Sequence, residues 1–466
     1  MSPKLYEEAF FMEQSGVFIL GISDCGEKMC AAGGRISTQS GNALGIWAKS
    51  QDAEKNANLI DKVTRSGHNS TVEHIFFNLA FSDVSVQVEQ FMIEFRLASF
   101  TVKSRRYVDF SDAGFYTPAF KSAENRAKYE AHVRSLFEAY SKLIDNGVPK
   151  EDARFVLPYC FLSNFFCSLN GRELLHVLKA MLYGRGAEMP EIYALGQSLR
   201  AQAEKLAPGL FAGFDERKPN ASDRPDFGFM EAIEKKSREK ELVELLGKTE
   251  NAEQIVVTAA LLEENRFTAE QIQQAVIDPE TAEKIIKAVL ATTRPRALEA
   301  VSYTFALNGV SLSTLTHFAR HRMHSLLVPN LNTVDRASYI VPENVKKDSE
   351  TLQAYVNAFE HNIHLYECMK ADGEAEALPY LLLSGNTVDL VSTMNGRELL
   401  LFMKLRSCTR AQWEIQLYAN AMLAVLRSEA NGIFRHYGPS CYVTGVCPEG
   451  RLSCGKAVEM KEKFKA

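Results

Sequence analysis

Hydrophobic and polar positions along this chain follow two periods, one typical of helices and one typical of strands. Between residues 126 and 145, apolar side chains recur every three or four positions, which predicts an amphipathic helix that stops at Asn146-Gly147. Its apolar face contains Tyr129, Val133, Phe137, Tyr140 and Ile144. A second helix of the same kind is predicted from Leu352, Tyr355, Phe359, Ile363 and Tyr366. Segments 73–81 and 301–307 read as strands, so the pattern favours an α+β fold in which these aromatic residues form the core.

A long internal repeat divides the chain into two halves. The segment LPYCFLSNFFCSLNGRELLHVLK begins at Leu157, and LPYLLLSGNTVDLVSTMNGRELLLFMK begins at Leu378. Asn170 and Asn395 occupy equivalent places in the two copies. Because the correspondence extends over a long distance, it predicts two homologous modules in tandem and excludes a solenoid of short repeats.

The boundary between the modules is expected where polar and helix-breaking residues replace the apolar periodicity, in the segment 214–244. We place it near residue 230. The predicted domains are therefore module one (1–230), module two (231–435) and a cysteine-containing C-terminal tail (436–466).

Composition narrows the classes of function. The 466 residues carry 53 basic and 58 acidic side chains, a formal net charge of -5, so the chain as a whole has no electrostatic preference for nucleic acid or an anionic membrane. The N-terminus lacks the pattern of a signal peptide and no apolar run is long enough to span a membrane, which predicts a cytoplasmic protein. Nine cysteines in such a chain are expected to be mostly reduced thiols. Glycine-rich nucleotide-binding loops are absent from the sequence.

Two clusters of cations are candidates for binding an anion. The first is Arg320-His321-Arg322, at the end of an apolar segment, where guanidinium groups could grip a phosphate or carboxylate. A solvated helix end is an equally weighted alternative. The second is the segment Ser104 to Tyr107, with Arg106 at its centre, which has the composition of a phosphate-binding loop or of an exposed basic turn.

Together these motifs resemble the flavin-dependent thymidylate synthase family (ThyX), whose motif is RHR-x-x-S-x-N-E-x-S-x-R-Y. RHRMHS at 320–325 matches its first part and SRRY at 104–107 matches its last part. Further matches are GHNSTVEH at 67–74, GRIS at 34–37, ARFVLP at 153–158, NGRELL in both halves and LRSCTRAQWEI at 405–415. The resemblance covers most of both modules and implies two ThyX-like modules, each an antiparallel sheet with helices.

The resemblance also implies a reaction. Members of the family transfer a methylene group from methylenetetrahydrofolate to C5 of dUMP, with FAD as the cofactor and NADPH as the source of the hydride. It further implies a homodimer that mimics the family's tetramer of single modules, with a small nucleotide as substrate and neither nucleic acid nor membrane as partner.

The two copies depart from the family pattern in complementary ways. Module one has Glu94-Phe95-Arg96 in place of RHR and Met181 in place of the arginine that activates dUMP, and module two has Ala375 where module one has Arg154. The resemblance therefore implies one composite pocket per chain. Its expected substrate-binding residues are Ser104, Arg106, Tyr107, Arg154 and Arg320, with Arg406 stabilising charge on the uracil.

For the flavin, the resemblance implies a set of hydroxyl, carboxylate and guanidinium side chains. They are Ser37, Ser70, Glu73, Asn170, Arg172, His321, Arg322, Asn395 and Arg397. Module two has Arg296 at the position of Ser70, which favours a single flavin site. An alternative interpretation makes Glu73 and His74 a hydrogen-bonded pair inside the core.

Several departures keep a second function open. The family's Asn-Glu pair is replaced by Thr101-Val102 in module one and by Leu327-Val328 in module two. Leu401 and Arg410 stand where the family has an asparagine and a histidine that contact the flavin. The alternative is therefore a catalytically retired ThyX-like protein that binds flavin or a pyrimidine nucleotide. A nucleic-acid-binding function is disfavoured by the negative net charge.

The tail holds a weak candidate for a metal site. His436, Cys441, Cys447 and Cys454 would suffice for tetrahedral zinc or a cluster, but their spacing is loose and lacks a CxxC pair. We expect thiols without metal here.

Overall fold

The computed structural model describes residues 15–219, 225, 227–230, 241–265, 267–430 and 432–465. The chain divides into two compact units. Unit one contains Met1–Lys235 and Val341–Ser384, and unit two contains Lys236–Ile340 and Gly385–Ala466. The expected join near residue 230 borders residues 231–240, which lie outside the described residues. Segment 341–384 lies within the predicted module two in the sequence but belongs to unit one in the fold.

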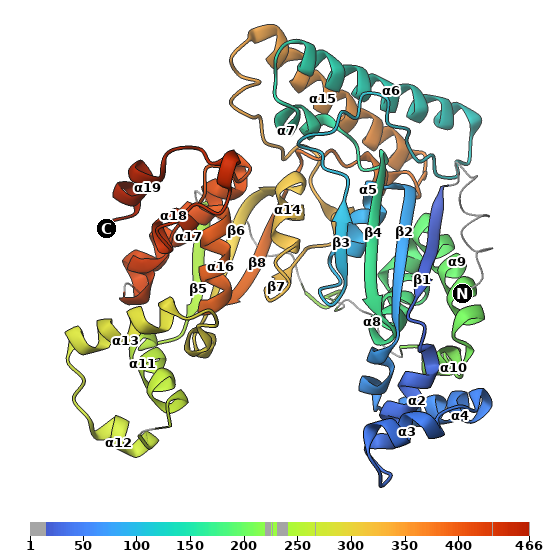
Figure 1. Ribbon diagram of the computed structural model, residues 1–466. Coiled ribbons are helices and arrows are strands. Elements are labelled where there is room, and N and C mark those ends of the chain that lie inside the picture. Colours follow the sequence, from blue (N-terminus) through green and yellow to red (C-terminus); the bar gives the residue numbers. More distant parts are fainter. Residues whose placement is uncertain are drawn as a thin grey trace. The chain divides into compact units, whose positions relative to one another are not determined.

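Unit one is built on a four-stranded antiparallel sheet with the strand order β1-β2-β4-β3 (Figure 1). Its strands are β1 (Gly16–Ile22), β2 (Phe76–Ser85), β3 (Ser99–Val102) and β4 (Leu162–Asn170). In β2 the buried residues Phe77, Leu79 and Phe81 alternate with more exposed neighbours. One face of the sheet therefore packs against the core, where it meets α8 (Gly171–Leu182) and α9 (Pro190–Leu206).

Helices α2 (Gly26–Ile36), α3 (Ala43–Lys49), α4 (Ala53–Arg65) and α10 (Pro208–Phe211) gather at one end of the sheet, with α10 against α4 (Figure 1). Helix α5 (Val86–Ile93) contacts β2 and β4. Helices α6 (Ala123–Asp145), α7 (Lys150–Ala153) and α15 (Ser349–Ala371) lie together at the other end (Figure 1). The two amphipathic helices predicted from the sequence are thus α6 and α15.

Helices α6 and α15 lie side by side and antiparallel (Figure 1). Each buries the apolar side chains of one face. His132 Nε2 is 3.1 Å from Asn362 Oδ1, and Asn146 Nδ2 donates to Thr351 Oγ1 over 3.0 Å. Beside them, the N–H of Tyr159 donates to the carbonyl of Leu382. These contacts explain why segment 341–384 folds as part of unit one.

Unit two repeats the sheet, with the strand order β5-β6-β8-β7. Its strands are β5 (Val243–Lys248), β6 (Ser302–Ser311), β7 (Ser325–Leu327) and β8 (Thr387–Asn395). Its helices are α11 (Ala252–Glu263), α12 (Ala269–Gln274), α13 (Pro279–Ala291), α14 (Leu312–Ala319), α16 (Gly396–Arg406), α17 (Trp413–Ala430), α18 (Ser440–Val443) and α19 (Ala457–Phe464).

The repeat holds at the level of single backbone irregularities. Strand β2 bulges at Asp83, which has a φ of 47°, and β6 bulges at the equivalent Gly309, which has a φ of 72°. The N–H at each bulge donates to an equivalent side chain of the next strand, that of Asn164 or Asp389. Because a bulge is specific in position, this agreement confirms the prediction of two homologous α+β modules.

The predicted strand over 73–81 begins too early. Residues 69–74 instead form a 3-10 helix, η1 (Asn69–His74), and strand β2 begins only at Phe76. The first turn of α8 lies close against η1, because a Cβ on Gly171 would lie 2.7 Å from the carbonyl oxygen of Val72. Glycine at position 171 permits this close approach.

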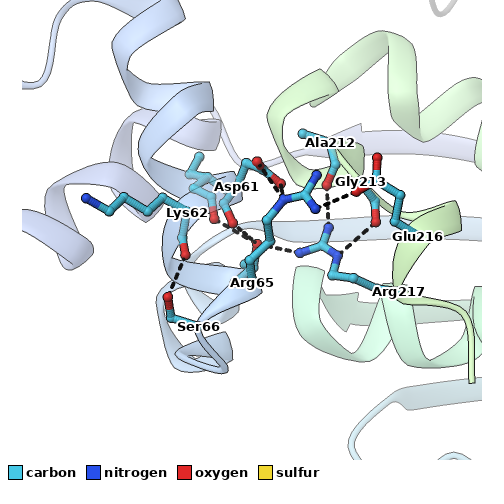
Figure 2. A network of polar contacts seen from close by, with 10 residues as sticks. Asp61, Lys62, Arg65, Ser66, Ala212, Gly213, Glu216 and Arg217 are labelled. Carbon is cyan, nitrogen blue, oxygen red and sulfur yellow. Dashed lines mark hydrogen bonds and ion pairs between the residues drawn. The ribbon is translucent and has the colours of Figure 1, made fainter.

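A network of polar contacts fixes the chain just before η1 (Figure 2). Arg65, at the end of α4, donates to Asp61 over 2.9 Å and contacts Glu216 at 2.5 Å. Arg217 donates to the carbonyl of Ala212 over 2.6 Å. The network joins the end of α4 to the segment that follows α10, and so it positions η1 with its candidate residues.

No helix of the described residues is long and apolar enough to cross a membrane.

Candidate functional site

The motif Arg320-His321-Arg322 lies in a turn that follows α14. Arg320 is the C-cap of that helix, and β7 begins at Ser325. Arg320 and Arg322 are exposed, whereas His321 is only 6% exposed. The alternative of a solvated helix end therefore describes the two arginines but not the histidine between them.

His321 bridges two charged side chains of α16. Its Nδ1 is 2.9 Å from Glu398 Oε1, and its Nε2 accepts a hydrogen bond of 3.0 Å from Arg406 Nε. Since Nε2 is an acceptor, the proton of the neutral ring belongs on Nδ1, where it points at Glu398. The ring of Phe402 packs edge-on against the imidazole at 4.9 Å between centroids. We call Glu398, His321 and Arg406 the imidazole bridge.

Burial favours the neutral form of this histidine. It lowers the pKa of His321, the hydrogen bond to Glu398 opposes this effect, and the adjacent Arg406 cation lowers the pKa further. A neutral ring can accept from Arg406, whereas a protonated ring would place an N–H and a positive charge against the guanidinium.

Local sequence explains how α16 presents both partners. Asn395 caps the helix, since its Oδ1 accepts from the backbone N–H of Glu398 over 2.8 Å. Glu398 therefore lies in the first turn and Arg406 in the last, the ends that favour an anion and a cation respectively. Glu398 was not among the residues expected from the sequence, and its signal was the capping pattern of NGRELL.

Unit one replaces the imidazole bridge with apolar side chains. Phe95 stands in place of His321 and Met181 in place of Arg406, and both are buried. Glu173, the counterpart of Glu398, lies 3.4 Å from Nδ1 of His176 instead. Glu94 forms an ion pair of 2.5 Å with Arg185. Unit one thus has no guanidinium at the position of Arg406.

The second cation cluster lies in the loop after β3. Arg106 Nε donates to Glu151 Oε2 over 2.8 Å, and Arg154 Nε donates to the carbonyl of Glu151 over 3.1 Å. Arg154 is only 3% exposed, and Ser104 Oγ accepts from the backbone N–H of Arg106. We call Arg106 and Arg154 the arginine pair. The structure therefore brings together the two phosphate-binding residues expected for module one.

The other side chains of this loop divide between surface and core. Tyr107 is 69% exposed, and the Arg106 guanidinium lies 5.6 Å from its ring centroid. Arg105 is buried and pairs with Glu89 at 2.5 Å, so it supports the loop from inside. The alternative of an exposed basic turn is wrong for Arg105, which is 6% exposed.

The equivalent loop of unit two borders a different kind of pocket. A cavity of about 540 Å³ there is lined by Asp335, Asp389 and Glu241, together with apolar and neutral polar residues. Its described lining residues include no lysine or arginine. An anionic phosphate would be repelled there, which agrees with the loss of the substrate loop from module two.

Among the residues expected to bind flavin, two arginines form equivalent ion pairs in the two units, and two asparagines cap the N-termini of helices. Arg172 pairs with Glu73 at 2.7 Å, and Arg397 pairs with Glu299 at 2.5 Å in unit two. Asn170 caps α8 as Asn395 caps α16. The hydroxyl of Ser37 donates to the carbonyl of Gly34.

Two further residues of the segment that contains Glu73 lie at the surface. Ser70 and His74 are both exposed, so the alternative of a buried Glu73–His74 core pair is wrong. Arg296, at the position equivalent to Ser70, lies 3.7 Å from Glu299. Glu299 was not expected from the sequence, although the repeat of Glu73 pointed to it.

In the tail, the candidate metal ligands have other partners or surroundings. His436 Nε2 lies 3.1 Å from Glu283 Oε1, Cys441 is buried in α18, and Cys454 is exposed. Hydrogen bonds from Thr409 and the backbone of Lys456 lower the pKa of Cys454. Among the described residues, no group of three or more histidine, cysteine or acidic side chains is placed to hold a metal ion.

Two antiparallel α+β modules, one with the arginine pair and one with the imidazole bridge, define the class of the protein. The family model described as "Thymidylate synthase complementing protein" matches this chain twice, at residues 21–209 and 244–430. The chain belongs to this family, which is the one that its motifs resemble.

Individual relatives agree. A "Flavin-dependent thymidylate synthase" of Clostridium tetani is 34% identical over 241 residues, which are 48% of this chain and 96% of that protein. One of Geobacter sulfurreducens is 35% identical over 182 residues, 38% of this chain and 78% of that protein. A solved structure of the UMP/dUMP methylase PolB of Streptomyces cacaoi, bound with 5-Br dUMP, covers 44% of this chain and 99% of that chain at 22% identity, with a TM-score of 0.37.

Proposed function

We propose that this chain is a flavin-dependent methyltransferase that converts dUMP to dTMP, with methylenetetrahydrofolate as one-carbon donor and NADPH as reductant. The observation that carries the proposal is the complementary preservation of cations, the arginine pair in unit one and the imidazole bridge in unit two. We propose that one composite pocket per chain uses both sets, within the domains 1–230, 231–435 and 436–466.

The arginine pair has the chemistry to hold the phosphate of dUMP. The Glu151 carboxylate accepts a hydrogen bond from Arg106 Nε, and the Glu151 backbone carbonyl accepts one from Arg154 Nε. One residue therefore orients both cations. A guanidinium is planar and carries five N–H donors in a fixed fork, a geometry that matches the oxygens of a phosphate. Ser104 and the exposed Tyr107 would add hydroxyl groups to this binding set.

Arg406 is proposed to stabilise negative charge on the uracil ring. The imidazole bridge holds its Nε, so the guanidinium is oriented before the substrate arrives, and a preorganised cation stabilises developing charge without reorganisation. Arg320, exposed in the same turn, is proposed to complete the nucleotide contacts.

The flavin candidates fit the chemistry of FAD. Arg172 and Arg397 present guanidinium groups suited to a diphosphate, Glu73 pairs with Arg172, and Ser37 and Ser70 are exposed. Asn170 and Asn395 would act by fixing the helix ends that carry these arginines, with Arg322 as a further exposed cation. When bound, the flavin supplies the hydride of the reaction. A role of His321 as a flavin contact stays a prediction, since both of its ring nitrogens have protein partners here.

A visible absorption spectrum followed by a dUMP titration tests the proposal. We expect flavin bands near roughly 375 and 450 nm that shift when dUMP binds, and dUMP-dependent oxidation of NADPH in the presence of methylenetetrahydrofolate. Absence of flavin after reconstitution with excess FAD would overturn the proposal. Light scattering would test the accompanying proposal of a homodimer.

A catalytically retired flavin or nucleotide-binding protein is the second candidate. It is favoured by Thr101 and Val102 in β3 and by Leu327 in β7, which occupy the places of the family's Asn-Glu pair. Flavin and dUMP binding without any turnover would support this candidate over the first.

A further inference from the structure

The imidazole bridge links the two ends of one helix through a residue outside it. Glu398 and Arg406 are eight positions apart on α16, about 12 Å along the helix axis, so they cannot contact each other directly. His321 spans this gap, with Glu398 at one ring nitrogen and Arg406 at the other. All three belong to unit two.

The carboxylate at position 398 favours the tautomer of His321 that carries its proton on Nδ1. With a carboxylate at Nδ1, the proton belongs on Nδ1 and Nε2 offers a lone pair to Arg406. Without that acceptor, the ring is free to carry its proton on Nε2, where an N–H would face the N–H of Arg406. Two opposed donors repel, so the orientation of the guanidinium depends on a residue that does not touch it.

Unit one provides an internal comparison. Glu173 occupies the same place in the first turn of α8 that Glu398 occupies in α16, and both backbone N–H groups are capped by an asparagine. Glu173, however, lies 3.4 Å from Nδ1 of the exposed His176, and the positions of His321 and Arg406 are occupied in unit one by the buried Phe95 and Met181. Any contribution of the carboxylate to helix capping is therefore shared by both glutamates, whereas alignment of an arginine is specific to Glu398.

We propose that Glu398 is a positioning residue of the substrate site: by fixing the Nδ1–H tautomer of His321, it orients the Arg406 guanidinium toward a pyrimidine ring that carries negative charge. The inference rests on the proposed function, because it assigns Arg406 to the uracil of dUMP. Glu398 acts through His321 and does not contact the substrate.

The test compares Glu398→Ala with the matched variant Glu173→Ala in dUMP titrations at pH 8. We expect dUMP to bind about tenfold more weakly to the Glu398 variant and within about twofold of the parent protein to the Glu173 variant. Glu398→Gln retains an oxygen acceptor for Nδ1–H and should bind dUMP within about threefold of the parent. This third variant also keeps the test informative if alanine at 398 prevents folding.

A double-variant cycle separates positioning from general destabilisation. In a His321→Phe background, Glu398→Ala should weaken dUMP binding no further, since the bridging ring is already absent. Nitrogen NMR of the imidazole, assigned by comparison with the His321→Phe variant, should show a neutral ring protonated at Nδ1.

The outcomes distinguish the two proposals. If the parent protein binds dUMP and Glu398→Ala binds it equally well, or if the ring carries its proton on Nε2, the positioning role is overturned while the proposed function stands. If the parent protein binds no dUMP, the proposed function fails, and the substrate role of Glu398 fails with it.

Discussion

At the scale of single residues, the two units differ at positions where polar or charged side chains in unit two are replaced by apolar side chains in unit one. Phe95 packs edge-on against His176 at 5.2 Å between centroids, in the place where His321 accepts from Arg406. Met181 is fully buried at the position of Arg406. An unpaired cation in the apolar environment of unit one would be costly, so the loss of the histidine and of the arginine are coupled.

The depressed pKa of His321 gives a prediction on stability and pH. Burial lowers the pKa of this ring below its usual value near 6.5, so the unfolded chain binds a proton more readily than the folded one. The contribution of His321 to the free energy of unfolding is fully present above about pH 6.5 and is lost as the pH falls through the folded-state pKa. Urea unfolding at pH 7.5 and 5.5 should show a larger loss of unfolding free energy in the parent protein than in His321→Phe. Burial also lowers the pKa of His132, which both proteins share and which therefore cancels in the difference. An equal loss in the two proteins would contradict the prediction.

The arginine pair gives a second prediction. Arg106→Ala and Arg154→Ala should each weaken dUMP binding by at least about tenfold, because each removes a charge-assisted contact with the phosphate. Neither should change the affinity for deoxyuridine, which lacks the phosphate. Arg126→Ala, which removes a guanidinium from an exposed ion pair with Glu130 on α6, is the control. Competition binding measures the ratio of the affinities for dUMP and deoxyuridine in each variant. An equal loss of affinity for both ligands would show that the arginine pair supports the fold instead.

Sequence alone could predict which cations this chain retains but not how they are held. Arg106, Arg154 and Arg406 were expected from the motifs. Glu151, which accepts from the first two, and Glu398, which contacts His321 beside Arg406, were not expected. A carboxylate that orients a cation has no fixed spacing from it along the chain. Only the fold brings Glu398 to the imidazole of His321.

At the scale of elements, glycine decides how closely two of them approach. A Cβ on Gly396 would lie 2.7 Å from the carbonyl oxygen of Leu298, as one on Gly171 would lie 2.7 Å from that of Val72. Both glycines open a helix that starts from an asparagine cap and carries a candidate flavin arginine one residue later.

We therefore expect Gly171→Ala and Gly396→Ala to destabilise the protein by about 1–3 kcal/mol, because the backbone must shift to relieve the overlap. Gly247→Ala is the control, since its nearest neighbour would be Thr304 Cβ at 4.0 Å. Chemical denaturation measures the change in unfolding free energy. Destabilisation of the Gly247 variant by the same amount would show that the effect does not come from the close approach at Gly171 and Gly396.

The boundaries of elements show where periodicity fails as a guide. The apolar spacing placed α6 and α15 correctly, because a long helix has many repeats of its pattern. The same approach began the second strand at residue 73, although residues 69–74 form η1. The segment lies close against Gly171 at the start of α8, and its own apolar pattern does not reveal that contact.

At the scale of the whole chain, the repeat was visible in the sequence. The sequence did not reveal that segment 341–384 of module two folds as part of unit one. The pattern shows that α15 has an apolar face, without saying which helix covers it. The structure gives that face to α6, and Tyr380 of the same segment donates a 2.9 Å hydrogen bond to the buried Glu191 of α9. Two homologous modules have similar apolar faces. Only three-dimensional packing therefore shows whether a helix packs within its own module or against the other one.

The unequal preservation of the modules leads to a prediction on stoichiometry. If the arginine pair and the imidazole bridge serve one composite pocket, each chain should bind one dUMP, since the equivalent positions in the other combination hold Phe95, Met181 and Ala375. Calorimetry of dUMP binding, with flavin content measured by absorbance after release, should give about one of each per chain. Arg406→Ala should abolish detectable dUMP binding without removing the flavin, whereas Arg185→Ala, which breaks the ion pair with Glu94 in unit one, should leave the dUMP stoichiometry unchanged. Two dUMP molecules per chain would mean that both modules retain complete pockets. The apolar replacements in unit one would then have to be compatible with binding an anionic nucleotide, which their burial argues against.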